Sequence, residues 1–172
     1  MMIFKEKLNQ VKAFAFDVDG VFSDMLMLHP SGELMRTMNV KDGYAVQYAR
    51  RKGYPVAIIT GGSTESIRIR FNALGVDDVY LRSSDKIYDL NDFAARHALS
   101  LDRVLYMGDD IPDIEVMRAS GITACPADAA VEIKEIADYI SPKGACKGCV
   151  RDVIEQTLRV QGRWMEADAH RW

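Results

Sequence analysis

Residues 11–16 read Val-Lys-Ala-Phe-Ala-Phe and lead directly into Asp17-Val18-Asp19-Gly20. The six residues are apolar and β-prone apart from one lysine, which predicts a buried strand. Two carboxylates, two residues apart, are hard to explain by folding alone at the end of such a strand. An Asp-x-Asp pair can hold a divalent cation, attack an electrophile with one oxygen and move a proton with the second acid. This stretch therefore predicts both a strand of the central sheet and a catalytic loop.

The composition is that of an ordinary globular chain. It has 172 residues, 48% hydrophobic and 27% charged, which suits one domain with a sizeable core. The net charge of −3 gives no reason to expect nucleic acid or an anionic membrane as a partner. The first residues are too polar for a signal peptide and no apolar run is long enough to span a membrane, so we expect a cytoplasmic location. Three cysteines, an odd number, favour reduced thiols.

Apolar, β-branched runs alternate with amphipathic runs along the chain. The predicted strands are 11–16, 56–59, 78–81, 104–107 and 121–124. The predicted helices are 43–52, 64–74, 86–98, 112–119, 129–137 and 149–160. Such alternation predicts an α/β fold, a Rossmann-like parallel sheet with helices on both faces. We expect residues 1–163 to form a single domain and residues 164–172 to be a C-terminal tail.

One segment, residues 25–38, breaks the alternation. Two short apolar runs flank Pro30-Ser31-Gly32-Glu33, which predicts a β-hairpin with a four-residue loop just after the Asp-x-Asp loop. Both faces of this hairpin carry apolar side chains, so something should cover it. The cover is either another subunit or the rest of the same domain.

The polar residues at the strand ends suit phosphoryl transfer. Asp17 can attack phosphorus to give an aspartyl-phosphate, provided that a cation offsets the repulsion between carboxylate and phosphate. Mg²⁺ prefers oxygen ligands, and the Asp17 and Asp109 carboxylates with the Asp19 backbone carbonyl could supply them. The Asp19 side chain is then free to protonate the leaving oxygen and later to activate water.

Further along the chain, a second group of residues suits the phosphate itself. Thr60 and the N–H groups of Gly61 and Gly62 lead into a helix and could cradle an anion, while Lys86 offers a compact positive charge. Each feature has a plain structural alternative: a turn for Asp-x-Asp, a solvated helix residue for Lys86 and a helix cap for Asp109-Asp110. Their joint appearance at the ends of successive strands favours the catalytic interpretation, since ligands of parallel sheets bind there.

These motifs resemble those of the haloacid dehalogenase-like phosphohydrolase superfamily. The stretches that carry the resemblance are Asp17-Val18-Asp19-Gly20-Val21, Thr60-Gly61, Lys86, and Gly108-Asp109-Asp110 with Asp113. The resemblance implies a Rossmann-like fold, Mg²⁺, Asp17 as nucleophile and Asp19 as acid/base, with Asp110 and Asp113 in support. Only 40 residues separate Asp19 from Thr60 and only 25 separate Thr60 from Lys86, so neither interval can hold a cap domain.

Within the superfamily, the chain is most similar to the 3-deoxy-D-manno-octulosonate 8-phosphate phosphatases. The carrying stretches are 17–24, 39–44, 57–61, 70, 74–75, 86, 108–113 and 147–152. That family implies a homotetramer, lipopolysaccharide precursor synthesis and a phosphorylated sugar acid as substrate. It also implies substrate contacts from Asp19, Asn39, Val40, Lys41, Asp42, Gly43, Gln47, Gly61, Gly62, Arg70 and Lys86. Lys41 and Arg70 can meet the sugar's carboxylate, while Asn39 and Asp42 can bond its hydroxyls.

Two departures from that family fall where substrate contacts are expected. Gly62 stands where an arginine often follows Thr-Gly, and the tail contains Cys146-Lys147-Gly148-Cys149 in place of a Gly-rich run. The cysteine spacing is compatible with zinc or redox chemistry, but a zinc site lacks two further soft ligands nearby in the sequence. The departures leave open a nine-carbon sugar acid 9-phosphate of the sialic acid type as the substrate.

Two other classes of protein deserve comparison. A phospho-receiver domain also uses aspartates, threonine and lysine on a parallel sheet, but there the paired acids come first and here the Asp-Asp pair comes last. A non-catalytic scaffold would need a broken motif, and none is broken. Phosphomonoester hydrolysis is therefore the predicted activity.

Overall fold

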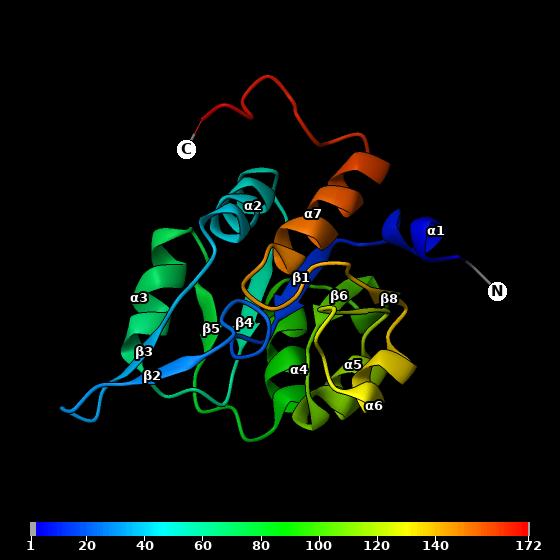
Figure 1. Cartoon of the computed structure of the whole chain (residues 1–172). Helices are drawn as coiled ribbons and strands as arrows, with labels where there is room; N and C mark the ends of the chain where they lie inside the picture. Colours follow the sequence, from blue (N-terminus) through cyan, green and yellow to red (C-terminus); the bar gives the residue numbers. More distant parts are fainter. Residues whose placement is uncertain (1–2, 172) are drawn as a thin grey trace.

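The computed structural model describes residues 3–171 and contains alternating strands and helices (Figure 1). The strands are β1 (Ala13–Phe16), β2 (Leu26–Leu28), β3 (Leu34–Arg36), β4 (Val56–Ile59), β5 (Asp78–Tyr80), β6 (Val104–Met107), β7 (Ile122–Cys125) and β8 (Tyr139–Ile140). The helices are α1 (Phe4–Leu8), α2 (Val40–Arg51), α3 (Glu65–Ala73), α4 (Lys86–Arg96), α5 (Ile114–Ala119), α6 (Val131–Ile136) and α7 (Cys149–Val160). Short 3₁₀ turns, Leu101–Arg103 and Ile111–Asp113, precede β6 and α5.

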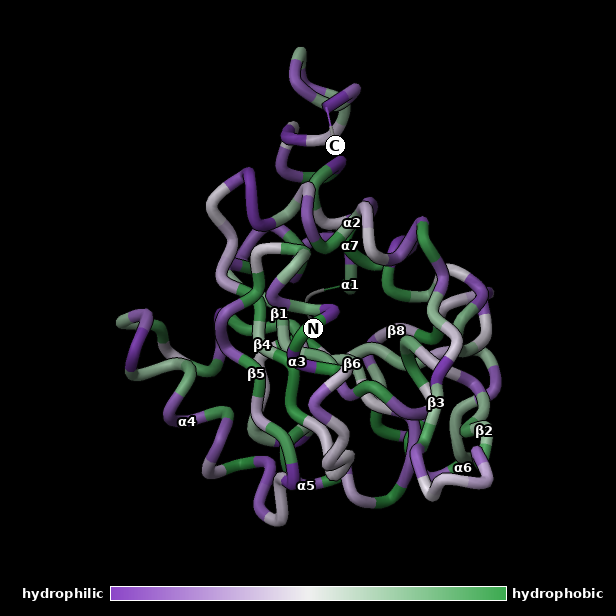
Figure 2. The backbone as a smooth tube through the Cα atoms, turned by 90° about the vertical axis from the view of Figure 1, so that its left-hand side faces the viewer, coloured by the Kyte–Doolittle hydropathy of each residue, from purple (hydrophilic) through white to green (hydrophobic). Residues whose placement is uncertain are grey.

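The sheet confirms the predicted α/β class. Its strand order is β5-β4-β1-β6-β7-β8, and every pair of neighbours is parallel. One hydrophobic core lies between the sheet and α1, α2, α3 and α7, and a second lies between the opposite face and α4, α5 and α6. Figure 2 shows that the hydropathy of strands and helices differs: the central strands are largely hydrophobic, whereas α4 alternates between hydrophilic and hydrophobic residues. The chain runs outward from β1 through β4 to β5, then crosses back to β6 and runs outward to β8. The switch point, where ligands of such sheets bind, therefore lies between β1 and β6.

The predicted elements match those observed to within a few residues at their ends. The predictions for 56–59, 104–107 and 149–160 agree with β4, β6 and α7. Helix α1 and strand β8 were not predicted, because five and two residues are too short to show a periodicity. Helix α2 begins at Val40, before the predicted start at Gly43, because Asn39 caps it by accepting a hydrogen bond from the Lys41 N–H.

The hairpin forms as predicted from β2 and β3, and it projects from the body of the molecule (Figure 1). Within residues 3–171, the segment from Asp19 to Thr60 holds this hairpin, α2 and β4, and the segment from Thr60 to Lys86 holds α3 and β5, so there is no cap domain. The hairpin's apolar side chains are exposed, including Met25 (71%) and Leu28 (81%). Packing within the chain therefore does not cover them.

The C-terminal part of the chain lies against α2. Helix α7 buries Val153 and Ile154 in the first core, and the residues after it run back along α2. Lys52 pairs there with Glu166 and Asp168. Residues 1, 2 and 172, which the predicted domain and tail include, lie outside the described residues. All three cysteines are free thiols, and no helix in the described part of the chain is long and apolar enough to cross a membrane.

Candidate active site

A cleft of about 620 Å³ lies beyond the carboxyl ends of β1, β4 and β6. Its lining residues are Asp17, Asp19, Gly20, Asp24, Thr60, Gly61, Gly62, Ser83, Lys86, Asp109, Asp110, Pro112 and Asp113. The structure thus brings together the residues of all four predicted motifs from segments nearly one hundred residues apart. The parallel sheet does this, because the carboxyl ends of its central strands meet at one edge.

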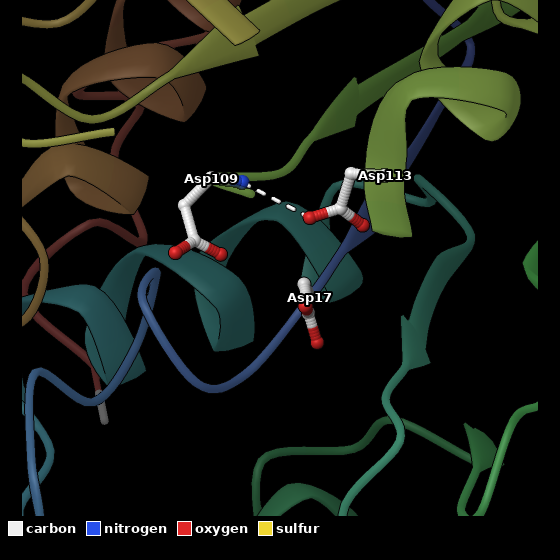
Figure 3. A group of neighbouring side chains, drawn as sticks. All are labelled: Asp17, Asp109 and Asp113. Atoms are coloured by element: carbon white, nitrogen blue, oxygen red, sulfur yellow. Dashed lines mark hydrogen bonds between the residues drawn. The ribbon is translucent and has the colours of Figure 1, made fainter. Parts of the chain in front are cut away.

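Three carboxylates converge in this cleft. Asp17, Asp109 and Asp113 each offer an oxygen within 4.8 Å of the others, and they come from the loops after β1 and β6 (Figure 3). Asp17 is 9% exposed and Asp113 is 1% exposed. Burial raises the pKa of Asp17 to about 6, and the Asp113 charge adds to the effect. Burial also raises the pKa of Asp109 to about 7, with further contributions from Asp17 and Asp113.

Lys86 supplies the positive charge of the cluster. Its Nζ lies 2.7 Å from Asp17 Oδ2 and 2.7 Å from Asp113 Oδ1, at the first residue of α4. Burial alone would lower the pKa of Lys86, but the two carboxylates outweigh it and the pKa is raised. Lys86 therefore stays charged and neutralises part of the negative charge around Asp17.

Asp113 is held by several donors at once. Its Oδ1 also accepts from the Tyr106 hydroxyl at 2.8 Å, and its Oδ2 accepts from the Asp109 N–H at 3.0 Å. These bonds fix both Lys86 and the start of the Asp109 loop. Asp113 was predicted to have a supporting role. Tyr106 was not predicted, because the sequence does not distinguish a tyrosine with a functional hydroxyl from a core residue of a buried strand.

The cluster fits a hard divalent cation. Asp109 Oδ1 is buried and has no hydrogen-bond partner, and a buried bare carboxylate oxygen is costly unless a cation meets it. Asp17 and Asp109 would hold Mg²⁺, since each Asp113 oxygen already accepts two hydrogen bonds, whereas each Asp17 oxygen accepts one. Gly20 makes room for this arrangement: its φ is +87°, and a Cβ there would lie 1.7 Å from Asp109 Oδ2.

The second motif, Thr60–Gly62, forms another part of the cleft wall. Thr60 is buried and its Oγ1 accepts from the Gly62 N–H at 3.1 Å, which closes a tight turn before α3. The loop between β5 and α4 holds this turn from outside, through Arg82 N–H to Gly62 O and Ser83 N–H to Thr60 O, both at 3.0 Å. These bonds hold the turn in place, and Thr60, Gly61 and Gly62 line the cleft, although the Gly62 N–H is already donated to Thr60 Oγ1.

The predicted substrate residues fall into separate groups. Val40 and Arg70 line a neighbouring pocket of about 410 Å³ together with Arg36, and Gly43 lies beside the Arg70 guanidinium. Lys41 is exposed near the start of α2. Asn39 also donates to the Cys146 carbonyl at 3.2 Å, so the loop before α7 approaches this region.

Two of these residues lie elsewhere. Asp42 is fully buried and its Oδ1 accepts from the Arg151 N–H at 2.7 Å, so it joins α2 to the start of α7. Gln47 lines a different pocket with Arg50 and Asn72, away from the catalytic cleft. Neither residue lines the catalytic cleft, and their predicted substrate contacts stay a prediction. The reason for the placements is helical geometry: residues three and four apart share a face, and Asp42 turns toward α7 while Gln47 turns toward α3.

The Asp19 side chain is paired with Arg36 of β3, which sequence analysis did not single out. The cluster capable of holding a metal within residues 3–171 contains no cysteine, so nothing in the structure supports a zinc site at Cys146 and Cys149.

An all-parallel sheet with paired aspartates after its first strand, and with threonine, lysine and aspartates after the others, defines a hydrolase of the haloacid dehalogenase type.

Comparison with known proteins agrees with this class. The family model of the haloacid dehalogenase-like hydrolases matches residues 78–154. The 3-deoxy-D-manno-octulosonate 8-phosphate phosphatase of Escherichia coli strain K12 is 33% identical over 162 residues, which cover 94% of this chain and 86% of that protein. The chain therefore belongs to the haloacid dehalogenase-like hydrolases, in the family of 3-deoxy-D-manno-octulosonate 8-phosphate phosphatases.

Solved structures of the same family superpose closely. The phosphatase from Yersinia pestis has a TM-score of 0.91 and 30% identity, covering 93% of this chain and 87% of that chain. The phosphatase from Moraxella catarrhalis, solved with a magnesium ion, a phosphate ion and a KDO molecule, has a TM-score of 0.90 and 30% identity. The match covers 94% of this chain and 93% of that one.

Proposed function

We propose that the protein is a Mg²⁺-dependent phosphatase that hydrolyses 3-deoxy-D-manno-octulosonate 8-phosphate to the free sugar acid and phosphate. The observation that carries the proposal is the cluster of Asp17, Asp109 and Asp113 at the switch point of the sheet, with the Lys86 ammonium bound to Asp17 and Asp113. The relatives named above act on this substrate, and one of them binds magnesium, phosphate and KDO. The product would enter lipopolysaccharide precursor synthesis.

The residues divide the reaction into two displacements. An oxygen of Asp17 attacks phosphorus, the bond to the sugar oxygen breaks, and that oxygen takes a proton from Asp19. Water then attacks the aspartyl-phosphate, gives its proton back to Asp19 and releases phosphate and the Asp17 carboxylate. Lys86 and the turn at Thr60–Gly62 hold the phosphoryl oxygens throughout. When bound, Mg²⁺ would neutralise charge between phosphate and carboxylates.

The substrate-binding residues remain a proposal at the level of single side chains. Arg70 suits a carboxylate, since guanidinium and carboxylate pair with matched geometry. Asn39 and Lys41 lie at the start of α2, on the side of the molecule that faces the hairpin. A nine-carbon sugar acid 9-phosphate is the alternative substrate, because it carries the same carboxylate and phosphate.

We also propose a homotetramer in which the hairpins cover one another. The support is the exposed apolar surface of Met25, Leu26, Met27, Leu28 and Met35, which the chain itself leaves uncovered. A single domain over residues 1–163 and a cytoplasmic location likewise stay predictions of the sequence.

The test is a phosphate-release assay on the eight-carbon and nine-carbon substrates, with Mg²⁺ and with excess chelator. We expect the larger kcat/KM for the eight-carbon substrate, and no release with chelator. Asp17→Asn should abolish release with the far-UV spectrum unchanged, because it removes the attacking oxygen's charge and keeps the side chain's size. Turnover that survives in Asp17→Asn or in chelator would contradict the mechanism.

A further inference from the structure

Arg36 reaches from the hairpin to the proposed acid/base. Its Nε donates to Asp19 Oδ1 at 2.7 Å and its Nη2 donates to Asp19 Oδ2 at 2.9 Å, which makes a bidentate pair. Its Nη1 donates to Thr64 Oγ1 at 3.2 Å, at the residue before α3. The Arg36 side chain is 6% exposed, whereas that of Asp19 is 37% exposed. The guanidinium is thus locked from behind, and the carboxylate that it holds faces the cleft.

Gly62 leaves the space that the guanidinium occupies. A Cβ at position 62 would lie 3.1 Å from Arg36 Nη2, 3.0 Å from Ile67 Cδ1 and 3.3 Å from Thr60 Oγ1. Each distance is tighter than normal carbon contacts, and φ at Gly62 is not in the left-handed region, so backbone strain does not explain this glycine. A side chain at this position would force Ile67, Arg36 or Thr60 to shift by a few tenths of an ångström, so the glycine leaves room for the guanidinium.

A purely structural role for this pair is the alternative. A salt bridge that only ties the hairpin to the body could sit anywhere along β3, and exposed pairs of that kind contribute little to stability. The Arg36 side chain is instead only 6% exposed, donates from all three of its guanidinium nitrogens and meets the carboxylate that the proposed reaction uses for proton transfer. A side chain whose reacting atoms must be placed to within about 0.5 Å needs hydrogen bonds or packing that fix its rotamer.

We propose that Arg36 is a positioning residue that orients the Asp19 carboxylate for proton transfer, and that Gly62 is required to make room for it. The inference rests on the proposed function only in taking Asp19 as the acid/base. Arg36 lines the neighbouring pocket with Arg70 and does not line the catalytic cleft, so its effect passes through Asp19.

The decisive experiment is a double-mutant cycle with Arg36→Ala and Asp19→Ala, measured as kcat/KM. We expect Arg36→Ala alone to lower kcat/KM for the sugar acid phosphate about 100-fold, within the range of general acid catalysis. In the Asp19→Ala background, the same change should alter kcat/KM less than about twofold, since the group that it positions is gone. Equal losses in both backgrounds would overturn the inference and indicate substrate contact or a structural role.

The leaving group provides a second readout. Nitrophenolate leaves without a proton, so Arg36→Ala should lower kcat/KM for p-nitrophenyl phosphate only about fivefold or less. Added guanidinium should restore part of the loss in Arg36→Ala and none in Asp19→Ala. Arg36→Lys, which keeps the charge and loses the bidentate fork, should fall between wild type and Arg36→Ala. Equal loss on both substrates, without rescue, would argue for a structural clamp.

Controls separate the possible failures. Arg118→Ala removes an arginine from the exposed side of α5 and should leave both substrates unaffected. Gly62→Ala should reproduce part of the Arg36→Ala defect, because its Cβ displaces Nη2. A wild type without phosphate release would sink the proposed function, whereas an active wild type with an equally active Arg36→Ala would sink only the positioning role.

Discussion

Asp109→Asn should make the metal-free protein more stable while it abolishes catalysis. Burial and the nearby Asp17 and Asp113 charges raise the pKa of Asp109 from its ordinary value of 3.8 to about 7. The native protein therefore binds more protons than the unfolded chain between about pH 4 and pH 7, and its stability falls as the pH rises through this window. Asparagine carries no charge and avoids this penalty.

The size of the effect follows from the pKa shift. A shift of about 3 units at about 1.36 kcal/mol per unit gives an upper limit of about 4 kcal/mol. Asp109 is only half-buried, and solvent screening reduces the expected gain to about 2 kcal/mol at pH 8. At pH 4 the gain should nearly vanish, because the wild-type carboxyl is then protonated in the native state.

Urea unfolding at pH 4.5, 6 and 8 in excess chelator measures this difference. Asp110→Asn is the matched control, since it removes the same charge from an exposed neighbour and keeps an oxygen for the hydrogen bond to the Ile111 N–H. Added Mg²⁺ should stabilise the wild type and leave Asp109→Asn unchanged. An Asp109→Asn variant no more stable than wild type at pH 8, or a gain that does not grow with pH, would refute the electrostatic argument.

Three further outcomes follow from the structure. Gly20→Ala should displace Asp109 and so lower Mg²⁺ affinity and kcat more than tenfold, as Mg²⁺ titration and turnover assays would measure. Gly32→Ala is the control, because φ there is a similar +86° and nothing lies within 4 Å of the added Cβ. It should cost only about 1 kcal/mol of stability in an unfolding assay. Leu28→Glu should shift the assembly toward monomers in light scattering, and an unchanged mass would argue against hairpin contacts between subunits. Ending the chain at Gly162 should lower the free energy of unfolding by about 1–3 kcal/mol and leave kcat within twofold of the wild-type value. A large loss of kcat would indicate that the tail reaches the active site of a neighbouring subunit.

The chemistry was predictable because it lies in short, local patterns. Asp17 and Asp19 follow an apolar run, and Asp109 follows another, so the parallel-sheet rule alone places them at one edge. The lack of a cap domain was equally predictable, since it depends only on chain length between motifs. Thr60 and Lys86 could be added because they too stand where a strand gives way to a helix.

The substrate residues were less predictable, because helix faces decide them. Asp42 and Gln47 both lie on α2, yet one contacts the α7 backbone and the other faces a separate pocket. Nothing in the local sequence indicates which face of α2 would meet α7. Tyr106 was hidden for a similar reason, since its hydroxyl acquires a role only when Asp113 lies within 2.8 Å.

The sequence by itself therefore determined the fold class and the class of reaction, and it predicted the nucleophile, because hydrophobic periodicity and motif order are properties of neighbouring residues. The tertiary structure decided which groups hold those residues in place. Arg36 meets Asp19 across a hairpin, Lys86 meets Asp113 across two strands, and Gly62 stays bare for a side chain 26 positions earlier. Such contacts arise only when the sheet, the hairpin and α3 pack together, since each depends on distances between segments that are remote in the chain.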